Sequence, residues 1–299
     1  MLKITAVVRT YNRPQWLPQM LDCLVNQDYD DYEVIIFNNG STDSETETII
    51  KHYVDTYKHF FSVAQNVNSR QKDYLQLPVE AYTSGDYITW LDDDDRCEPH
   101  YLSFLASLAL SHQADIAICG SYNEYMDGTL QPYFVGDDLL VMDKLAALTC
   151  FLQRQHFNTA PPTKLFRKEL LVSSPAWMHL LKTVQTPPSE DVFYTYRYME
   201  QANKVVVHNR PLYYFKKHDS NDSIIQHDDS HWSPGLMKGY LEAYRIREHY
   251  LLERHPSLKP VIIQATTDFM TSMLSKIEKN KWSGYDHLKA YMEAYINVF

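Results

Sequence analysis

The alternation of strand-like and helix-like segments along the first 120 residues is the feature that most restricts the fold of this chain. Short runs rich in β-branched residues, at 3–8, 33–37 and 86–91, are separated by stretches with apolar residues at helical spacing, at 14–27 and 44–57. The run at 33–37 is apolar through its middle, as in a strand that helices cover on both faces. This order predicts an α/β fold with a mostly parallel central sheet flanked by helices.

Further signals continue the alternation. Strands are expected near 61–64, 115–126 and 204–215, helices over 74–83, 99–113 and 143–153 and from Glu190, and a short proline-bracketed segment at 160–171. Ser44 and Glu47 match a capping box at the start of the second helix.

The last part of the chain has a different character. From Ser233 on there is no strand signal, and helical segments are interrupted at "RHPSLKP" and "NKWSG". We therefore expect a domain over residues 1–232 and a helical C-terminal module over 233–299. The apolar face that includes Leu241 and Leu251 predicts packing within the chain. Pairing of subunits is the second alternative for this face, and contact with a membrane surface is the third.

Composition excludes several classes of protein. A formal charge of −10 argues against a general nucleic-acid binder, which needs a basic surface. The sequence contains neither GxGxxG nor GxxxxGK[ST], the two glycine-rich phosphate-binding motifs. No apolar stretch approaches the ~20 residues of a membrane span, and the N-terminus does not resemble a signal peptide. Together with four scattered cysteines, these features predict a cytoplasmic protein, with a position at the inner face of the membrane as an alternative.

Three polar clusters follow three of the expected strands: "RTYNRP", "NNGSTD" and "DDDD". Ligands of open α/β sheets bind outside the carboxyl ends of the strands, so we expect the three clusters to share one rim. The four consecutive carboxylates from Asp92 to Asp95 repel one another. A solvated acidic turn is one interpretation of this run, and a site for a divalent cation is the other.

Longer stretches carry a resemblance to a known family. "VVRTYNRPQWLPQMLDCLVNQDYDDYEVIIFNNGSTD", "GDYITWLDDDDRCEPHYL" and "SEDVFYTYRYM" together resemble the inverting GT-A glycosyltransferases of family 2. The resemblance implies a GT-A fold with a C-terminal helical extension and a nucleotide-sugar donor, most simply a UDP-sugar. It also implies Mn²⁺ or Mg²⁺ as cofactor, and an acceptor hydroxyl on a saccharide or glycoconjugate of the surface polysaccharide type.

The same resemblance implies roles for the acidic run. Asp92 is assigned to the ribose and Asp94 to the cation, and Asp95 supports both. Asp93 is grouped with the nucleotide-binding acids, with exposure to solvent as the alternative. Carboxylate oxygens are ligands that Mg²⁺ and Mn²⁺ prefer, and a cation there offsets the charge of a diphosphate leaving group.

The first loop supplies the nucleoside contacts that the resemblance implies. These residues are Thr10, Tyr11, Asn12 and Arg13, with the Tyr11 ring against the base. A strand-end turn without a ligand is the alternative interpretation of this loop.

The second loop departs from the family, which usually has two aspartates where this chain has Asn38 and Asn39. The Asn39 carbonyl can still accept a hydrogen bond from a uracil imide, but an amide also donates, so selectivity for uracil is not implied. Arg70 and Lys72 are the candidates for a basic contact to base or phosphate.

An "ED" pair at the start of an expected helix matches the family's catalytic acids. Asp191 is the expected general base, Glu190 accompanies it, and Arg197 is placed to hold one of these carboxylates. His218, after the last strand, corresponds to a family histidine that completes the metal shell or contacts a phosphate; a purely structural histidine is the alternative. Two other functions stay open: a nucleotidyltransferase, and a catalytically inactive sugar-nucleotide binding protein.

Overall fold

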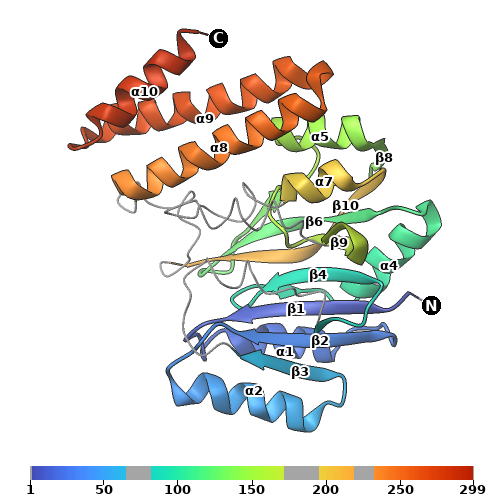
Figure 1. The fold of residues 1–299 in the computed structure, drawn as a ribbon. Helices are drawn as coiled ribbons and strands as arrows, with labels where there is room; N and C mark the ends of the chain where they lie inside the picture. Colours follow the sequence, from blue (N-terminus) through green and yellow to red (C-terminus); the bar gives the residue numbers. More distant parts are fainter. Residues whose placement is uncertain (1, 65–81, 172–194, 219–231, 299) are drawn as a thin grey trace.

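The computed structural model describes residues 2–64, 82–171, 195–218 and 232–298 (Figure 1). Its strands are β1 Ile4–Thr10, β2 Tyr32–Asn38, β3 Phe60–Ala64, β4 Tyr87–Asp92, β5 Arg96–Cys97, β6 Ile116–Tyr125, β7 Leu130–Tyr133, β8 Leu139–Asp143, β9 Lys164–Arg167 and β10 Lys204–Lys217. Its helices are α1 Leu17–Val25, α2 Ser44–Thr56, α4 Tyr101–His112, α5 Lys144–Gln153, α7 Tyr196–Gln201, α8 Pro234–Arg254, α9 Lys259–Asn280 and α10 Asp286–Ile296, with single 3-10 turns at Lys168–Leu171 and Pro256–Leu258. The expected helix over 74–83 lies largely outside the described residues, as does the start of the helix expected from Glu190, whose continuation is α7.

The described strands form one sheet in the order β3-β2-β1-β4-β9-β6-β10-β5, with β7 attached to β6 and β8 to β10. Strands β1 to β4 pair in parallel, and so do β6 and β10. The short strands β5, β7, β8 and β9 join antiparallel. The predicted α/β fold with a central sheet flanked by helices is confirmed, and the parallel pairing belongs to its longer strands.

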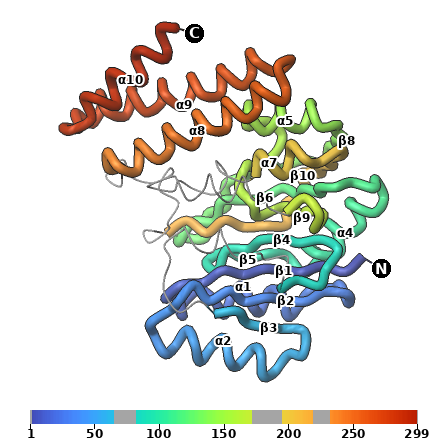
Figure 2. The backbone as a smooth tube through the Cα atoms, in the orientation of Figure 1, coloured from blue at the N-terminus to red at the C-terminus, as the bar shows by residue number. Residues whose placement is uncertain are grey.

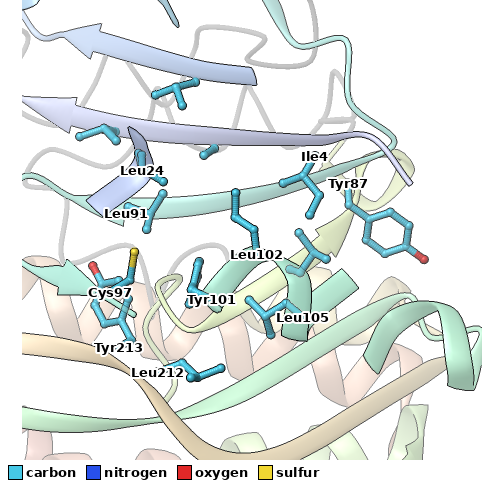
Figure 3. Close-up of a cluster of buried hydrophobic side chains, with 14 of the residues drawn as sticks. Ile4, Leu24, Tyr87, Leu91, Cys97, Tyr101, Leu102, Leu105, Leu212 and Tyr213 are labelled. Carbon is cyan, nitrogen blue, oxygen red and sulfur yellow. The ribbon is translucent and has the colours of Figure 1, made fainter. Parts of the chain in front are cut away.

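Alternate residues of the strands face two different helical layers. Ala6 and Val8 of β1 lie in a core with α1, α2 and α4, whereas Val7 lies in the opposite core with α5 and α7. Figure 3 shows the first of these cores, where Tyr101 of α4 lies close to Leu91 and Tyr213 of the sheet. The Tyr101 hydroxyl is hydrogen-bonded to the Thr89 hydroxyl at 2.7 Å, so this buried ring keeps its polar group satisfied.

The N-cap residue of α2 lies one residue before the expected one. Asp43, not Ser44, is the N-cap residue, and its Oδ1 accepts a hydrogen bond from the Thr46 N–H at 2.6 Å. The capping-box assignment of Ser44 and Glu47 is therefore wrong in register, because Asp43 has the extended backbone that a cap requires while Ser44 is already helical.

The last three helices lie together along one side of the molecule, in orange and red in Figures 1 and 2. They share an apolar cluster of their own, which includes the stacked rings of Tyr244 and Phe269 with centroids 4.0 Å apart. Leu251 of α8 and Ile262 of α9 also pack into the core shared with α5 and α7. This packing confirms a helical C-terminal region, while a domain boundary between 232 and 233 stays a prediction. Across the described part of the chain, no helix combines the length and the apolar character needed to cross a membrane.

Candidate functional site

The loops that follow β1, β2 and β4 meet at one rim of the sheet. Register pairs Thr10 with Asn38 across β1 and β2, and Arg9 with Asp92 across β1 and β4. The three strands run in the same direction and end on the same side, at the left in Figure 1. The expectation that three polar clusters converge there is confirmed.

Hydrogen bonds between the first two loops fix their shape. Asn12 adopts a φ of +50°, a left-handed conformation that Asn tolerates better than most residues. Its Oδ1 accepts from the N–H groups of Thr42 at 2.8 Å and Asp43 at 3.3 Å, and its own N–H donates to Ser41 Oγ at 3.0 Å. The Asn38 Oδ1 accepts from the Ser41 N–H at 2.8 Å. Asn12 and Asn38 thus hold the backbone of the rim.

The remaining expected nucleoside residues lie at the same rim. Thr10 is buried, Tyr11 is half-buried, and the Asn39 N–H donates to the Thr10 carbonyl at 2.9 Å. These positions bring Tyr11 and Asn39 close to the end of β1.

The acidic run is enclosed by protein. Asp93, Asp94 and Asp95 are 3%, 5% and 4% exposed, so the alternative that Asp93 faces solvent is wrong, and so is the interpretation of the run as a solvated turn. Asp92 is the most accessible of the four, with a side chain 41% exposed. Its Oδ1 lies 3.4 Å from the Arg9 guanidinium.

A second guanidinium lies between two of the buried acids. Arg13 Nη1 is 2.8 Å from Asp94 Oδ2 and 3.2 Å from Asp93 Oδ1. The same Asp94 oxygen is 3.1 Å from His218 Nε2. Arg13 and His218 therefore converge on the carboxylate that the sequence assigns to a cation.

Asp95 has a different environment. Its Oδ2 accepts a hydrogen bond from the Tyr213 hydroxyl at 2.7 Å, and its Oδ1 accepts from the Lys216 N–H at 2.8 Å. The Tyr213 oxygen also accepts from the Asp92 N–H at 3.2 Å. Asp95 thus ties the acidic loop to β10, which fits the supporting role expected for it.

Burial and the charges of neighbouring acids disfavour the ionised forms of Asp93 and Asp95. Burial raises the pKa of Asp93 to about 7; the Arg13 charge opposes this shift, and the Asp94 charge adds to it. Burial, followed by the charges of Asp94 and Asp92, raises the pKa of Asp95 well above its usual range. Arg9 and Arg13 contact only three of the four carboxylates, so the rim has an affinity for additional positive charge.

The ring of His218 is held on its other side by Trp16, the residue before α1. The two rings stack with centroids 4.7 Å apart and planes inclined by 21°. Lys216 Nζ lies 4.9 Å from the Trp16 ring centroid and donates to Gln19 Oε1 at 3.0 Å. The end of β10 is thereby fastened to the start of α1.

Sequence reasoning missed three contributors to this site. The pattern placed Trp16 on the apolar face of a helix and Tyr213 inside a strand, and it gave Arg9 no role. A signal existed for Arg9 alone: it is the last but one residue of β1, and parallel pairing of β1 with β4 places it beside Asp92.

Four expected site residues lie outside the described residues: Glu190, Asp191, Arg70 and Lys72. Their roles stay predictions. Arg197 is described, and its guanidinium lies 4.6 Å from the Tyr250 ring centroid, between α7 and α8.

The donor set of the rim fits a hard divalent cation. Asp94 offers a carboxylate, His218 an imidazole, and Asp93 Oδ2 is a buried oxygen without a hydrogen-bond partner among the described residues. Within those residues no group of three His, Cys, Asp or Glu side chains is arranged to hold a metal ion. Mg²⁺ and similar ions are often bound by one or two carboxylates together with substrate phosphates, which this arrangement suits.

A family model described as glycosyl transferase family 2 matches residues 5–172. Among curated proteins, glycosyltransferase GlyA of Streptococcus pneumoniae serotype 4 is 30% identical over 137 residues, which are 44% of this chain and 18% of that protein. TarS of Staphylococcus aureus, named a poly(ribitol-phosphate) β-N-acetylglucosaminyltransferase, is 23% identical over 218 residues, 72% of this chain and 35% of that protein. The chain thus spans well under two thirds of the length of either relative.

Solved structures show the same fold. The crystal structure of S. aureus TarS residues 1–349 with UDP-GlcNAc matches 99% of this chain and 88% of that one, with a TM-score of 0.65 and 18% identity. A mannosyltransferase from Pyrobaculum calidifontis, in complex with GDP-Man and Mn²⁺, matches 99% of this chain and 85% of that one, with a TM-score of 0.52 and 13% identity.

Proposed function

Because the chain belongs to glycosyl transferase family 2, we propose that it transfers a sugar from a nucleotide-diphosphate donor to an acceptor hydroxyl, with inversion and with the aid of Mn²⁺ or Mg²⁺. The observation that carries the proposal is the burial of Asp93, Asp94 and Asp95 at the rim where β1, β2 and β4 end. Buried acids are costly unless something compensates them, and a cation bound with a diphosphate does so.

Asp94 and His218 would hold the cation, and diphosphate oxygens would complete its shell. When bound, the cation neutralises the charge that grows on the leaving diphosphate. Asp92 would accept a hydrogen bond from a ribose hydroxyl, and its position as the most accessible acid of the run supports this role. Asp95 keeps the acidic loop in place through Tyr213.

The donor is proposed to be a UDP-sugar. Tyr11 is half-buried beside the end of β1, where its ring can lie against a base. Asn39 offers a carbonyl for the uracil imide in place of the usual aspartate. TarS, a structural relative, has been crystallised with UDP-GlcNAc, which supports this donor class.

The acceptor is proposed to be a saccharide or glycoconjugate of a surface polysaccharide, as the printed name of TarS suggests for that relative. Asp191 is proposed as the general base that takes the proton of the acceptor hydroxyl, with Glu190 beside it. A single base suits inversion, because the hydroxyl attacks in line with the leaving group.

A product assay with a panel of UDP-sugars and saccharide acceptors tests the function. We expect Asp94→Asn to lower kcat/KM at least about 100-fold, because it removes a cation ligand. Asp191→Asn should lower kcat by a similar factor while UDP affinity stays within about threefold. Asp55→Asn, an exposed acid on α2, is the matched control and should behave as wild type.

Two results would contradict the proposal. Formation of a nucleotide sugar from a nucleoside triphosphate and a sugar phosphate would identify a nucleotidyltransferase. Binding of UDP-sugars without any product across the panel would identify an inactive binding protein.

A further inference from the structure

We propose that Arg13 occupies the cation position of the donor-free protein and leaves it for the diphosphate when donor and cation bind together. The inference rests on the proposed function and adds to it an order of events: the cation binds weakly until the nucleotide is present.

The position of the guanidinium is the first argument. Arg13 Nη1 lies 2.8 Å from Asp94 Oδ2 and 3.2 Å from Asp93 Oδ1, and its side chain is 18% exposed. It thus contacts the oxygen of Asp94 that a cation held between Asp94 and His218 would need. A guanidinium and a divalent cation cannot both lie within contact distance of that oxygen without strong repulsion.

The incomplete ligand set is the second argument. Within the described ranges no three metal-ligating side chains converge, so a cation that arrives alone finds two carboxylates already paired with Arg13. It would have to displace the guanidinium and so break two close ion pairs at once. A diphosphate gives the displaced guanidinium new anionic partners, since arginine matches phosphate oxygens with paired donors.

The loop geometry is the third argument. The backbone before Arg13 is fixed by the bonds of Asn12 to Ser41, Thr42 and Asp43, so the movement is confined to the side chain. Coupling between two binding sites is reciprocal. If the nucleotide draws Arg13 away and so tightens cation binding by some factor, the cation must tighten nucleotide binding by the same factor.

The test measures Mn²⁺ directly, by the paramagnetic resonance signal of the free ion, with and without UDP. For wild type we expect UDP to tighten Mn²⁺ binding at least about tenfold. In Arg13→Gln we expect Mn²⁺ alone to bind at least about tenfold tighter than in wild type, with a smaller enhancement by UDP. Arg13→Lys keeps the charge but loses the planar guanidinium. Its affinity for Mn²⁺ alone should lie between those of wild type and Arg13→Gln, and it replaces Arg13→Gln in the test if that variant does not fold.

Arg167→Gln is the matched control for a general loss of positive charge. Arg167 pairs with Asp115 at 2.8 Å and lies opposite Tyr87 at the start of β4, away from the rim, so its removal should change the affinity for Mn²⁺ alone by less than about threefold. The inference is overturned, and the proposed function left intact, if wild type binds Mn²⁺ with UDP but neither Arg13 variant gains affinity for Mn²⁺ alone. It is also overturned if Arg167→Gln gains as much affinity for Mn²⁺ alone as Arg13→Gln. Absence of Mn²⁺ binding to wild type with either UDP or GDP would remove both proposals.

Discussion

Asp93 is a buried acid whose burial costs stability in the donor-free protein. It is 3% exposed, it shares the Arg13 guanidinium with Asp94, and its second oxygen has no hydrogen-bond partner among the described residues. Burial raises its pKa to about 7, so near neutral pH this carboxyl is only partly ionised in the donor-free protein. The acidic run is therefore a source of instability that a bound cation can relieve.

The pH dependence of stability follows from this shift. Between pH 4 and 7 the folded protein keeps the proton on Asp93, whereas the unfolded chain, with a pKa near 3.8, has lost it. The folded state binds more protons than the unfolded state between pH 4 and 7. Asp93 therefore lowers the free energy of unfolding as pH rises through this range, and this loss is reversed as pH is lowered. We expect Asp93→Asn to flatten the decline by about 1 kcal/mol per pH unit between pH 5 and 7, measured by urea denaturation. Equal slopes for wild type and variant would contradict this assignment.

The sequence identified the acids of the site and some, but not all, of their partners. Asp92 to Asp95, Asn12, Arg13 and His218 were named as candidates because motif residues cluster just after strands and resemble those of the family, and the structure brings them to one rim. Arg9 and Trp16 were missed because their roles come from contacts between segments, such as the Trp16 stack on His218, that local pattern does not encode. The exposure suggested for Asp93 was wrong because the depth of a loop depends on what packs over it.

At the scale of elements, β10 is the strand that completes the site. Its Tyr213 hydroxyl donates to Asp95 and accepts from the Asp92 N–H, and its last residue precedes His218. The ring itself is buried in the core with Tyr101 and Leu91, as Figure 3 shows. One side chain thus connects the hydrophobic core to the acidic loop.

Removing that hydroxyl should be costly. Tyr213→Phe leaves Asp95 Oδ2 buried with one partner fewer and the Asp92 N–H without its acceptor, so we expect a loss of about 1–3 kcal/mol in the free energy of unfolding. Tyr122→Phe is the control, a half-buried tyrosine of β6 that stacks on Tyr214; it should change stability by less than about 0.5 kcal/mol. Chemical denaturation measures both. If Tyr213→Phe is as stable as the control, Tyr213 does not anchor the loop.

Helices and strands with a clear periodic spacing of apolar residues were predictable, and the shortest strands were not. The strands β1, β2 and β4 and the helices α1, α2 and α4 follow from apolar spacing. Strands β5 and β9, of two and four residues, owe their pairing to β10, β4 and β6, so no local signal predicts them. Helix α2 was predicted, but its cap was placed at Ser44 instead of Asp43 because both residue types are good caps.

At the scale of the whole molecule, the fold class was predictable and the order of the strands was not. Strand β9 enters the sheet between β4 and β6, far from its neighbours in sequence, and β10 pairs with three other strands. Such pairings depend on long-range packing. The expected C-terminal helices are present, and the contact of α9 with α5 places them against the helices that cover the sheet rather than apart from them.

The central claim is that the acids of the rim bind a nucleoside diphosphate and a divalent cation as one unit. Calorimetric titration of UDP, and of GDP for comparison, into the protein with Mn²⁺ or with a chelator tests it most directly. We expect at least one diphosphate to bind at least about tenfold tighter with Mn²⁺, and Asp94→Asn to abolish that difference. Failure of both diphosphates to bind wild type, or equal affinity with Mn²⁺ and with chelator, would contradict the claim.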